Sequence, residues 1–270
     1  MHRFRALAAL VAVFASALPA CSFQGGLGSV DDPTPVDTEA PAPVVTTPPP
    51  AKTSKSAPAP APVPAVAEDT FAEVVYVFMR AKDRSGWMCT GTLVGEREVV
   101  TAAHCIDPNE FVSYEIVAPL APGRPRVTAR SPRVFGGTYE DVANPDIGTL
   151  ALDTPVVLPR YAVLTDVVDR VEAGEALSAA AVVRTEEKAE APLEKTGPLP
   201  LSSAVSLGYD HGFATPMFSK GGDSGAGLFL VEDGKMTHKL VGVARQPEPD
   251  RQLDHLTRID AAFLAFRAAN

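Results

Sequence analysis

Cysteine, basic residues and long apolar runs are all scarce in this sequence of 270 residues. Three cysteines are too few for a small disulfide framework or a zinc ribbon. The formal net charge of −9 argues against a protein that binds nucleic acid or a membrane surface through a basic face. The uncharged run at residues 6–18 is too short to span a bilayer as a mature helix. The length allows one ordinary domain or two small ones.

The first twenty residues have the organisation of an export signal. Basic residues precede the uncharged run at 6–18, which has the length of a signal-peptide hydrophobic region. The following LPAC sequence ends at Cys21 and resembles a bacterial lipobox. The resemblance implies that residues 1–20 are a lipoprotein signal peptide and that Cys21 becomes lipidated. The alternative is ordinary secretion with cleavage after Ala20, which leaves Cys21 as a free thiol.

Residues 21–68, which begin with the lipidated cysteine, are predicted to be a disordered tether. Positions 22–68 hold eleven prolines and eight alanines. Such a segment buries too little apolar surface to offset the entropy of ordering it, and its Pro-Ala repeats favour extended polyproline II. The tether would hold a domain clear of a membrane. Because Ser22 is not aspartate, the lipobox resemblance implies the outer rather than the inner membrane of the cell envelope.

Residues 69–270 are predicted to form one β-rich domain. Short runs rich in Val, Ile, Leu, Tyr and Phe favour strands, and Gly, Asn, Asp and Pro between them indicate turns. The expected strands are 71–79, 92–94, 99–101, 147–152, 177–184, 228–231 and 240–244. Many short strands predict a barrel or a sandwich. Helical spacing of apolar residues at 260–268 predicts one short terminal helix.

Three short motifs point to a function. They are TAAHC around His104, NPDIGTLAL around Asp146 and GGDSG around Ser224. Each alone has an ordinary structural explanation, such as a surface histidine, a turn aspartate or a glycine-rich loop. Along the chain the three residues come in the order His, Asp, Ser. This order differs from that of subtilisins, which is Asp, His, Ser, and from that of α/β-hydrolases, which is Ser, acid, His.

With these motifs, residues 71–266 resemble the chymotrypsin and trypsin family of serine proteases. The resemblance implies an all-β fold of two six-stranded antiparallel Greek-key barrels, with a short C-terminal helix and an active site between the barrels. It implies a serine endopeptidase in which Ser224 is the nucleophile, His104 the general base and Asp146 the residue that orients the imidazole. The backbone N–H groups of Gly222 and Ser224 would form the oxyanion hole.

The resemblance also implies a disulfide between Cys89 and Cys105 that braces the histidine. It places Phe218 at the base of the primary specificity pocket, which argues against a preference for Lys or Arg and favours an apolar or small side chain. No metal or organic cofactor is expected, because the other histidines lack metal-ligand spacing. We expect a monomer that acts on protein or peptide substrates and does not bind nucleic acid.

One departure from the family concerns activation. In the family, the ammonium of a freed Ile-Val-Gly-Gly terminus pairs with the aspartate before the nucleophile, which is Asp223 here. No such sequence stands near the start of the domain. Three explanations remain open: cleavage at an unfamiliar site, another cation paired with Asp223, or a site that is not properly formed. The last would make the protein a catalytically silent binding module of the cell envelope. Hydrolysis of a non-peptide ester is a further alternative.

Overall fold

The structure is a computed structural model that describes residue 67, residues 69–136, residue 139 and residues 141–269. The predicted signal peptide, Cys21 and nearly all of the predicted tether lie outside the described residues. Within the described part, no helix combines the length and the apolar character needed to cross a membrane.

The described residues form strands joined by short turns and helices. The strands are β1 (Val74–Ala81), β2 (Gly86–Gly95), β3 (Glu98–Thr101), β4 (Phe111–Val117), β5 (Arg126–Phe135), β6 (Ile147–Leu152), β7 (Val163–Leu164), β8 (Ser178–Arg184), β9 (Leu193–Lys195), β10 (Leu199–Pro200), β11 (Ser202–Ser203), β12 (Gly212–Pro216), β13 (Gly227–Glu232), β14 (Lys235–Glu248) and β15 (Leu253–Arg258). The α-helices are α1 (Val168–Glu172) and α2 (Ala261–Ala268), and the 3-10 helices are η1 (Ala103–Cys105), η2 (Val205–Leu207) and η3 (Pro249–Arg251).

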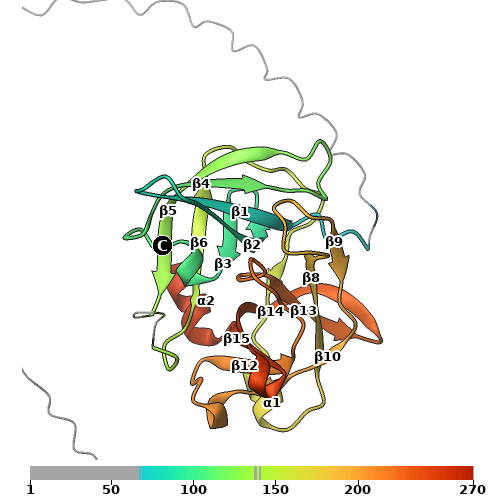
Figure 1. The fold of residues 1–270 in the computed structure, drawn as a ribbon. Coiled ribbons are helices and arrows are strands. Elements are labelled where there is room, and N and C mark those ends of the chain that lie inside the picture. Colours follow the sequence, from blue (N-terminus) through green and yellow to red (C-terminus); the bar gives the residue numbers. More distant parts are fainter. Residues whose placement is uncertain (1–66, 68, 137–138, 140, 270) are drawn as a thin grey trace, which may run out of the picture. The chain divides into compact units, whose positions relative to one another are not determined.

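The first six strands close into an antiparallel barrel in the order β1-β2-β3-β6-β5-β4, as expected (Figure 1). Alternation along β1 turns Val75, Val77 and Met79 into the barrel core. Leu93 and Leu150 reach the same core from β2 and β6 and are fully buried. Apolar residues at alternate positions of these strands therefore form the barrel core.

The second half of the domain is a nine-stranded sheet that does not close, which corrects the expectation of a second six-stranded barrel. Its main path is β10-β8-β13-β14-β15-β12-β11, with β9 added to β8 and β7 added to β14 in parallel. The two end strands belong to one short segment: β10 pairs with β8 and β11 pairs with β12, separated only by Leu201. This segment therefore lies at both ends of the sheet. Pro200 has no N–H group to donate to a further strand, so the ladder of hydrogen bonds ends there.

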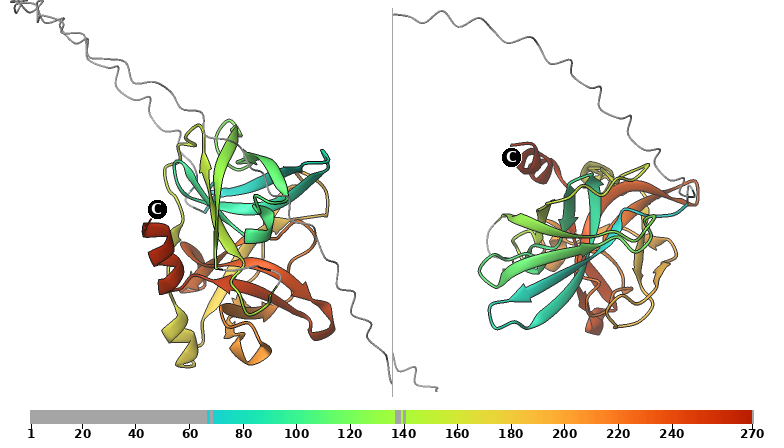
Figure 2. Two further views of the ribbon diagram at one scale, coloured as in Figure 1. Left: turned by 90° about the vertical axis from the view of Figure 1, so that its left-hand side faces the viewer. Right: turned by 90° about the horizontal axis from the view of Figure 1, so that it is seen from above.

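An apolar cluster joins the barrel to the second sheet and to α2. Its buried members come from both halves and from the last helix: Phe71, Val74, Val100, Ile147, Ala162, Val182, Phe229, Leu240, Val243, Ile259 and Phe263. The helix α2 begins after Asp260, whose carboxylate accepts a hydrogen bond from the N–H of Phe263 at 2.9 Å. Figure 2 shows α2 on the outside of the domain. The expected short C-terminal helix is confirmed.

Candidate active site

The pairing of β3 with β6 brings the predicted histidine and aspartate together. Thr101 pairs with Gly148, so His104 in η1 follows the end of β3 where Asp146 precedes the start of β6. The His104 Nδ1 atom lies 2.7 Å from Asp146 Oδ2, and the His104 backbone N–H donates to Asp146 Oδ1 at 2.9 Å. The Asp146 side chain is 2% exposed and the His104 side chain 31%. The carboxylate is therefore buried behind an imidazole that reaches solvent.

The predicted nucleophile, Ser224, lies in the turn between β12 and β13. The carbonyls on both sides of Asp223 are held by β2: the Thr90 N–H donates to the Ser224 carbonyl at 2.8 Å, and Thr90 Oγ1 donates to the Gly222 carbonyl at 3.1 Å. In the described part of the chain, neither the N–H of Gly222 nor that of Ser224 donates to a protein acceptor. The two predicted oxyanion-hole donors are thus unpaired N–H groups next to the serine side chain.

The nucleophile turn requires glycine at two positions. Gly222 has a φ of +85° and Gly225 a φ of +80°, which is the left-handed region that glycine enters without strain. A Cβ atom at Gly225 would also lie 2.1 Å from Thr101 Oγ1 and 2.3 Å from the Thr90 carbonyl oxygen. The glycines of the GGDSG motif therefore let this turn pack directly against β2 and β3.

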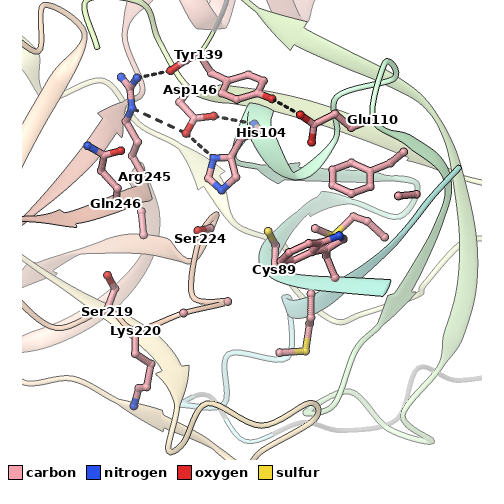
Figure 3. A pocket seen from close by; sticks show the side chains of 18 of the residues that line it. Cys89, His104, Glu110, Tyr139, Asp146, Ser219, Lys220, Ser224, Arg245 and Gln246 are labelled. Carbon is pink, nitrogen blue, oxygen red and sulfur yellow. Dashed lines mark hydrogen bonds and ion pairs between the residues drawn. The ribbon is translucent and has the colours of Figure 1, made fainter. Parts of the chain in front are cut away.

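The predicted catalytic residues line one cavity of about 950 Å³. Figure 3 shows Ser224 beside the imidazole of His104, on the side away from Asp146. Gly222 lines the same cavity. Strands of the barrel and of the second sheet both contribute walls, since His104 follows β3 and Ser224 precedes β13. The structure thus brings together all of the residues that the sequence assigned to the reaction.

The disulfide between Cys89 and Cys105 is present, with an S–S distance of 2.01 Å. It connects β2 to η1, and both cysteines are buried beside His104. These three residues also form a tight cluster of the type that can hold a metal ion. Because the disulfide consumes both thiols, this cluster offers no thiolate ligand in its oxidised form.

Asp223 is paired with Arg184, the last residue of β8. Arg184 Nε lies 3.2 Å from Asp223 Oδ1, and the backbone N–H of Lys220 donates to Oδ2 at 3.1 Å. The Arg184 guanidinium also donates to the carbonyls of Gly221 and Lys188. Burial raises the pKa of Asp223, and the hydrogen bonds and charge of Arg184 oppose that rise. Of the three explanations for the missing terminus, the structure favours another cation.

The base of the cavity differs from the sequence expectation in its lining. Phe218 packs against the core of the second sheet, and its neighbour Ser219 lines the cavity. Behind Ser219 lies Asp254 of β15, which is 1% exposed. One carboxylate oxygen of Asp254 accepts from the N–H groups of Phe218 at 2.5 Å and Ser219 at 2.7 Å, and the other accepts from Ser219 Oγ at 2.5 Å.

Two further buried charged residues beside the site, in addition to Arg184, had no predicted role. One is Asp254, and the other is Arg245 of β14, whose Nε lies 4.0 Å from Asp146 Oδ2. Arg245 directly follows the expected strand at 240–244, whereas Asp254 lies outside every expected strand. Charged residues are seldom fully buried unless they are paired. A charged residue directly after a strand pattern is therefore the signal by which Arg245 could have been noticed, and no such signal marks Asp254.

Comparisons with known proteins agree with this fold. The family model described as Trypsin matches residues 71–191. Similar solved structures include HL collagenase, with 14% identity, 75% of this chain and 94% of that chain covered and a TM-score of 0.59. GrC has 14% identity, with 76% of this chain and 96% of that chain covered and a TM-score of 0.59. Protease Anisep from Arthrobacter nicotinovorans has 12% identity, with 73% of this chain and 94% of that chain covered and a TM-score of 0.54. No curated protein matches the sequence. The described domain has the fold of the trypsin-family serine proteases.

Proposed function

We propose that the domain at residues 69–270 is a serine endopeptidase that cleaves peptide bonds through an acyl-enzyme on Ser224. The observation that carries the proposal is the His104–Asp146 pair, joined at 2.7 Å and opening into the cavity that Ser224 lines. A serine hydroxyl needs such an adjacent base to become nucleophilic at neutral pH.

Each group has one part in the proposed reaction. The Oγ atom of Ser224 attacks the carbonyl carbon of the peptide bond while His104 Nε2 takes its proton. Asp146 keeps the Nδ1–H tautomer facing itself and stabilises the imidazolium that forms. The N–H groups of Gly222 and Ser224 bind the oxyanion of the tetrahedral intermediate. His104 then gives its proton to the leaving amine, and water hydrolyses the acyl-enzyme with His104 again acting as base.

The Arg184–Asp223 pair supports a working site over a silent binding module. The alternative of a silent module rests on the absence of an Ile-Val-Gly-Gly sequence near the start of the domain. A buried arginine in contact with Asp223 gives that carboxylate a cation from within the folded domain. The shape of the nucleophile turn then does not depend on proteolytic activation.

Covalent labelling with a fluorophosphonate probe tests the proposal. The full chain, solubilised in detergent, is compared with its Ser224→Ala and His104→Ala variants. Stoichiometric labelling of the wild type alone is expected, because the probe reacts with a serine only when base and oxyanion hole are assembled. A wild type that remains unlabelled, before and after limited proteolysis, would overturn it. A panel of peptide and ester substrates then separates an endopeptidase from an esterase.

We also propose, on the sequence alone, that Cys21 carries a lipid anchor and that the 21–68 segment tethers a monomeric protease to the cell envelope. Several acyl chains hold a protein on a membrane firmly, whereas one holds it marginally. Radiolabelled palmitate should therefore enter the wild type and not a Cys21→Ser variant. The variant should move from the membrane fraction to the soluble fraction. Equal membrane association of both proteins would contradict the anchor.

A further inference from the structure

We propose that Arg245 is a positioning residue for the Asp146–His104 pair, holding the segment that carries Asp146 and placing a fixed positive charge beside that carboxylate. Its activity readout depends on the proposed function, so the test includes a second readout that does not require turnover. Three sets of contacts carry the inference.

The first set consists of hydrogen bonds from Arg245 to the segment that precedes Asp146. The Arg245 side chain is 5% exposed and comes from β14, in the second sheet. Its two terminal nitrogens donate to four backbone carbonyls: Nη1 to Val142 at 3.1 Å and Asn144 at 2.8 Å, and Nη2 to Tyr139 at 2.6 Å and Asp141 at 3.2 Å. A guanidinium has five N–H donors in one rigid plane, whereas a lysine ammonium has three on a flexible stem. The fork of an arginine is therefore needed to hold this segment at several points.

The second contact is the ion pair between Arg245 and Asp146 itself. Arg245 Nε lies 4.0 Å from Asp146 Oδ2, the oxygen that is also 2.7 Å from His104 Nδ1. Both side chains are nearly fully buried, so water screens this interaction little. Because a guanidinium stays charged in proteins, a permanent positive charge faces the same carboxylate oxygen as the imidazole. Arg245 therefore contributes a charge as well as hydrogen bonds to the position of Asp146.

The third set fixes the guanidinium from its other side. The Arg245 guanidinium carbon lies 5.4 Å from the centre of the Tyr209 ring, and that ring stacks on His255 at 3.8 Å. Gln246 Nε2 donates to the Tyr209 hydroxyl at 3.0 Å. Figure 3 shows the Arg245 side chain extending from its strand toward Tyr139 and Asp146. The guanidinium thus contacts the Tyr209 ring, which stacks on His255, as well as the carboxylate of Asp146.

The bond from Arg245 to the Tyr139 carbonyl also places an aromatic ring near the histidine. The Tyr139 ring lies 6.0 Å from the His104 imidazole between centres, and its hydroxyl donates to Glu110 at 3.2 Å. Other ionisable groups near these residues are Lys82, Asp83, Glu110 and Lys220 in the cavity wall, Asp107 beside Tyr139, and Glu248, which contacts the His255 ring that stacks on Tyr209. These groups are the same in every variant below, so a changed pH profile reports on Arg245.

The test compares Arg245→Gln, Arg245→Lys and the wild type in the detergent-solubilised full chain. The matched control is Arg170→Gln, which removes the same charge from an exposed arginine paired with Glu175. The rate of fluorophosphonate labelling is measured against pH. We expect Arg245→Gln to move the acid limb upward by about one pH unit, since a nearby charge shifts a titration by about 1–3 units. We expect Arg245→Lys to leave the acid limb in place but to lower the plateau rate about tenfold.

The second readout is the low-field NMR resonance of the His104 Nδ1 proton, measured in a Ser224→Ala background. Its titration midpoint should rise with Arg245→Gln and stay with Arg170→Gln. A folded Arg245→Gln protein with the wild-type acid limb and the wild-type resonance midpoint would overturn the inference. If Arg245→Gln does not fold, a wild-type plateau rate in Arg245→Lys would overturn it. If the wild type is not labelled at all, the proposed function fails, and the resonance alone decides the role of Arg245.

Discussion

Arg184 and Asp223 form a buried ion pair behind the nucleophile turn, with side chains 3% and 0% exposed. Arg184 ends β8, and Asp223 immediately precedes Ser224. The same guanidinium donates to the carbonyl of Gly221, so one side chain fixes both the aspartate and the start of the turn. The geometry of the proposed oxyanion hole would therefore depend on a residue within the domain.

Arg184→Met should destabilise the domain and abolish labelling of Ser224. The substitution leaves the Asp223 carboxylate buried without its cation, and breaking a buried pair in this way costs about 3–5 kcal/mol. Chemical denaturation at neutral pH measures the free energy of unfolding, and fluorophosphonate labelling measures the site.

The double variant Arg184→Met with Asp223→Asn is the matched control. It removes both charges, so it should recover part of the lost stability relative to the single variant. Labelling of Arg184→Met at the wild-type rate would show that another group shapes the turn. Labelling of the wild type with a long N-terminal extension still attached is expected, because no free terminus is required.

The pair Ser219 and Asp254 predicts a preference for Lys or Arg on the acyl side of the cleaved bond. Asp254 is buried and, within the described residues, has no cationic partner within ion-pair distance, while Ser219 connects it to the cavity. A hydrogen bond to a charged group contributes about 1.5–3 kcal/mol. Asp254→Asn should therefore lower kcat/KM for cationic substrates about tenfold or more and leave apolar substrates unchanged.

The preference is measured with a panel of peptides that differ only in the residue on the acyl side of the cleaved bond. The sequence favoured an apolar or small side chain because of Phe218, but Phe218 packs against the core of the second sheet. Faster cleavage after leucine than after lysine by the wild type would contradict the preference for Lys or Arg and would favour the apolar pocket expected from Phe218.

The positions of the candidate catalytic residues could be predicted because they depend on short-range features. His104 and Asp146 lie next to strands that were recognisable from Val99–Thr101 and Ile147–Leu152, and an antiparallel register brings such strand ends together. The glycines around Ser224 are needed for positive φ angles and close packing, and both requirements leave a mark in the sequence.

Other parts of the fold left a weaker mark. The strand β5 is largely exposed or half-buried and rich in arginine, and β15 buries Asp254, His255 and Thr257, so neither shows the expected alternation of apolar residues. The second sheet does not close, and this could not be predicted because its end strands, β10 and β11, are only two residues long each. The partners of Arg184 and Arg245 are distant in sequence, and only the tertiary fold determines that these charges are buried.

Removal of the Cys89–Cys105 disulfide should lower both stability and activity. The bond closes a loop with a sequence separation of 16, for which the chain-entropy model gives about 3 kcal/mol. For a domain of about 200 residues this corresponds to a fall in Tm of about 6–12 °C in the Cys89→Ala, Cys105→Ala variant. Labelling of Ser224 should slow, because Cys105 adjoins His104. Reductant should bring the wild-type Tm down to that of the variant, and an unchanged Tm in the variant would refute the stabilising role.

The cap of α2 predicts a loss of stability in acid. Burial alone would raise the pKa of Asp260, but hydrogen bonds from the Phe263 N–H and His211 and the charge of Arg258 outweigh it and hold the pKa below its usual 3.8. A lowered folded-state pKa means that the carboxylate stabilises the domain above the unfolded-state value and that this contribution disappears as pH falls through the folded-state value.

Asp260→Ala should lower the free energy of unfolding by about 1 kcal/mol at pH near 7, because it removes the helix cap. Asp260→Asn is the matched variant, since asparagine caps a helix about as well but carries no charge. Denaturant unfolding is measured from about pH 5 to about pH 2.5, a range that spans the ordinary pKa of an aspartate. The difference in the free energy of unfolding between wild type and Asp260→Asn should narrow as pH falls below about 4, because only the wild type loses a charge at position 260. A gap that stays constant through this range would mean that the carboxylate acts through its cap geometry and that its charge contributes nothing to the stability of the helix end.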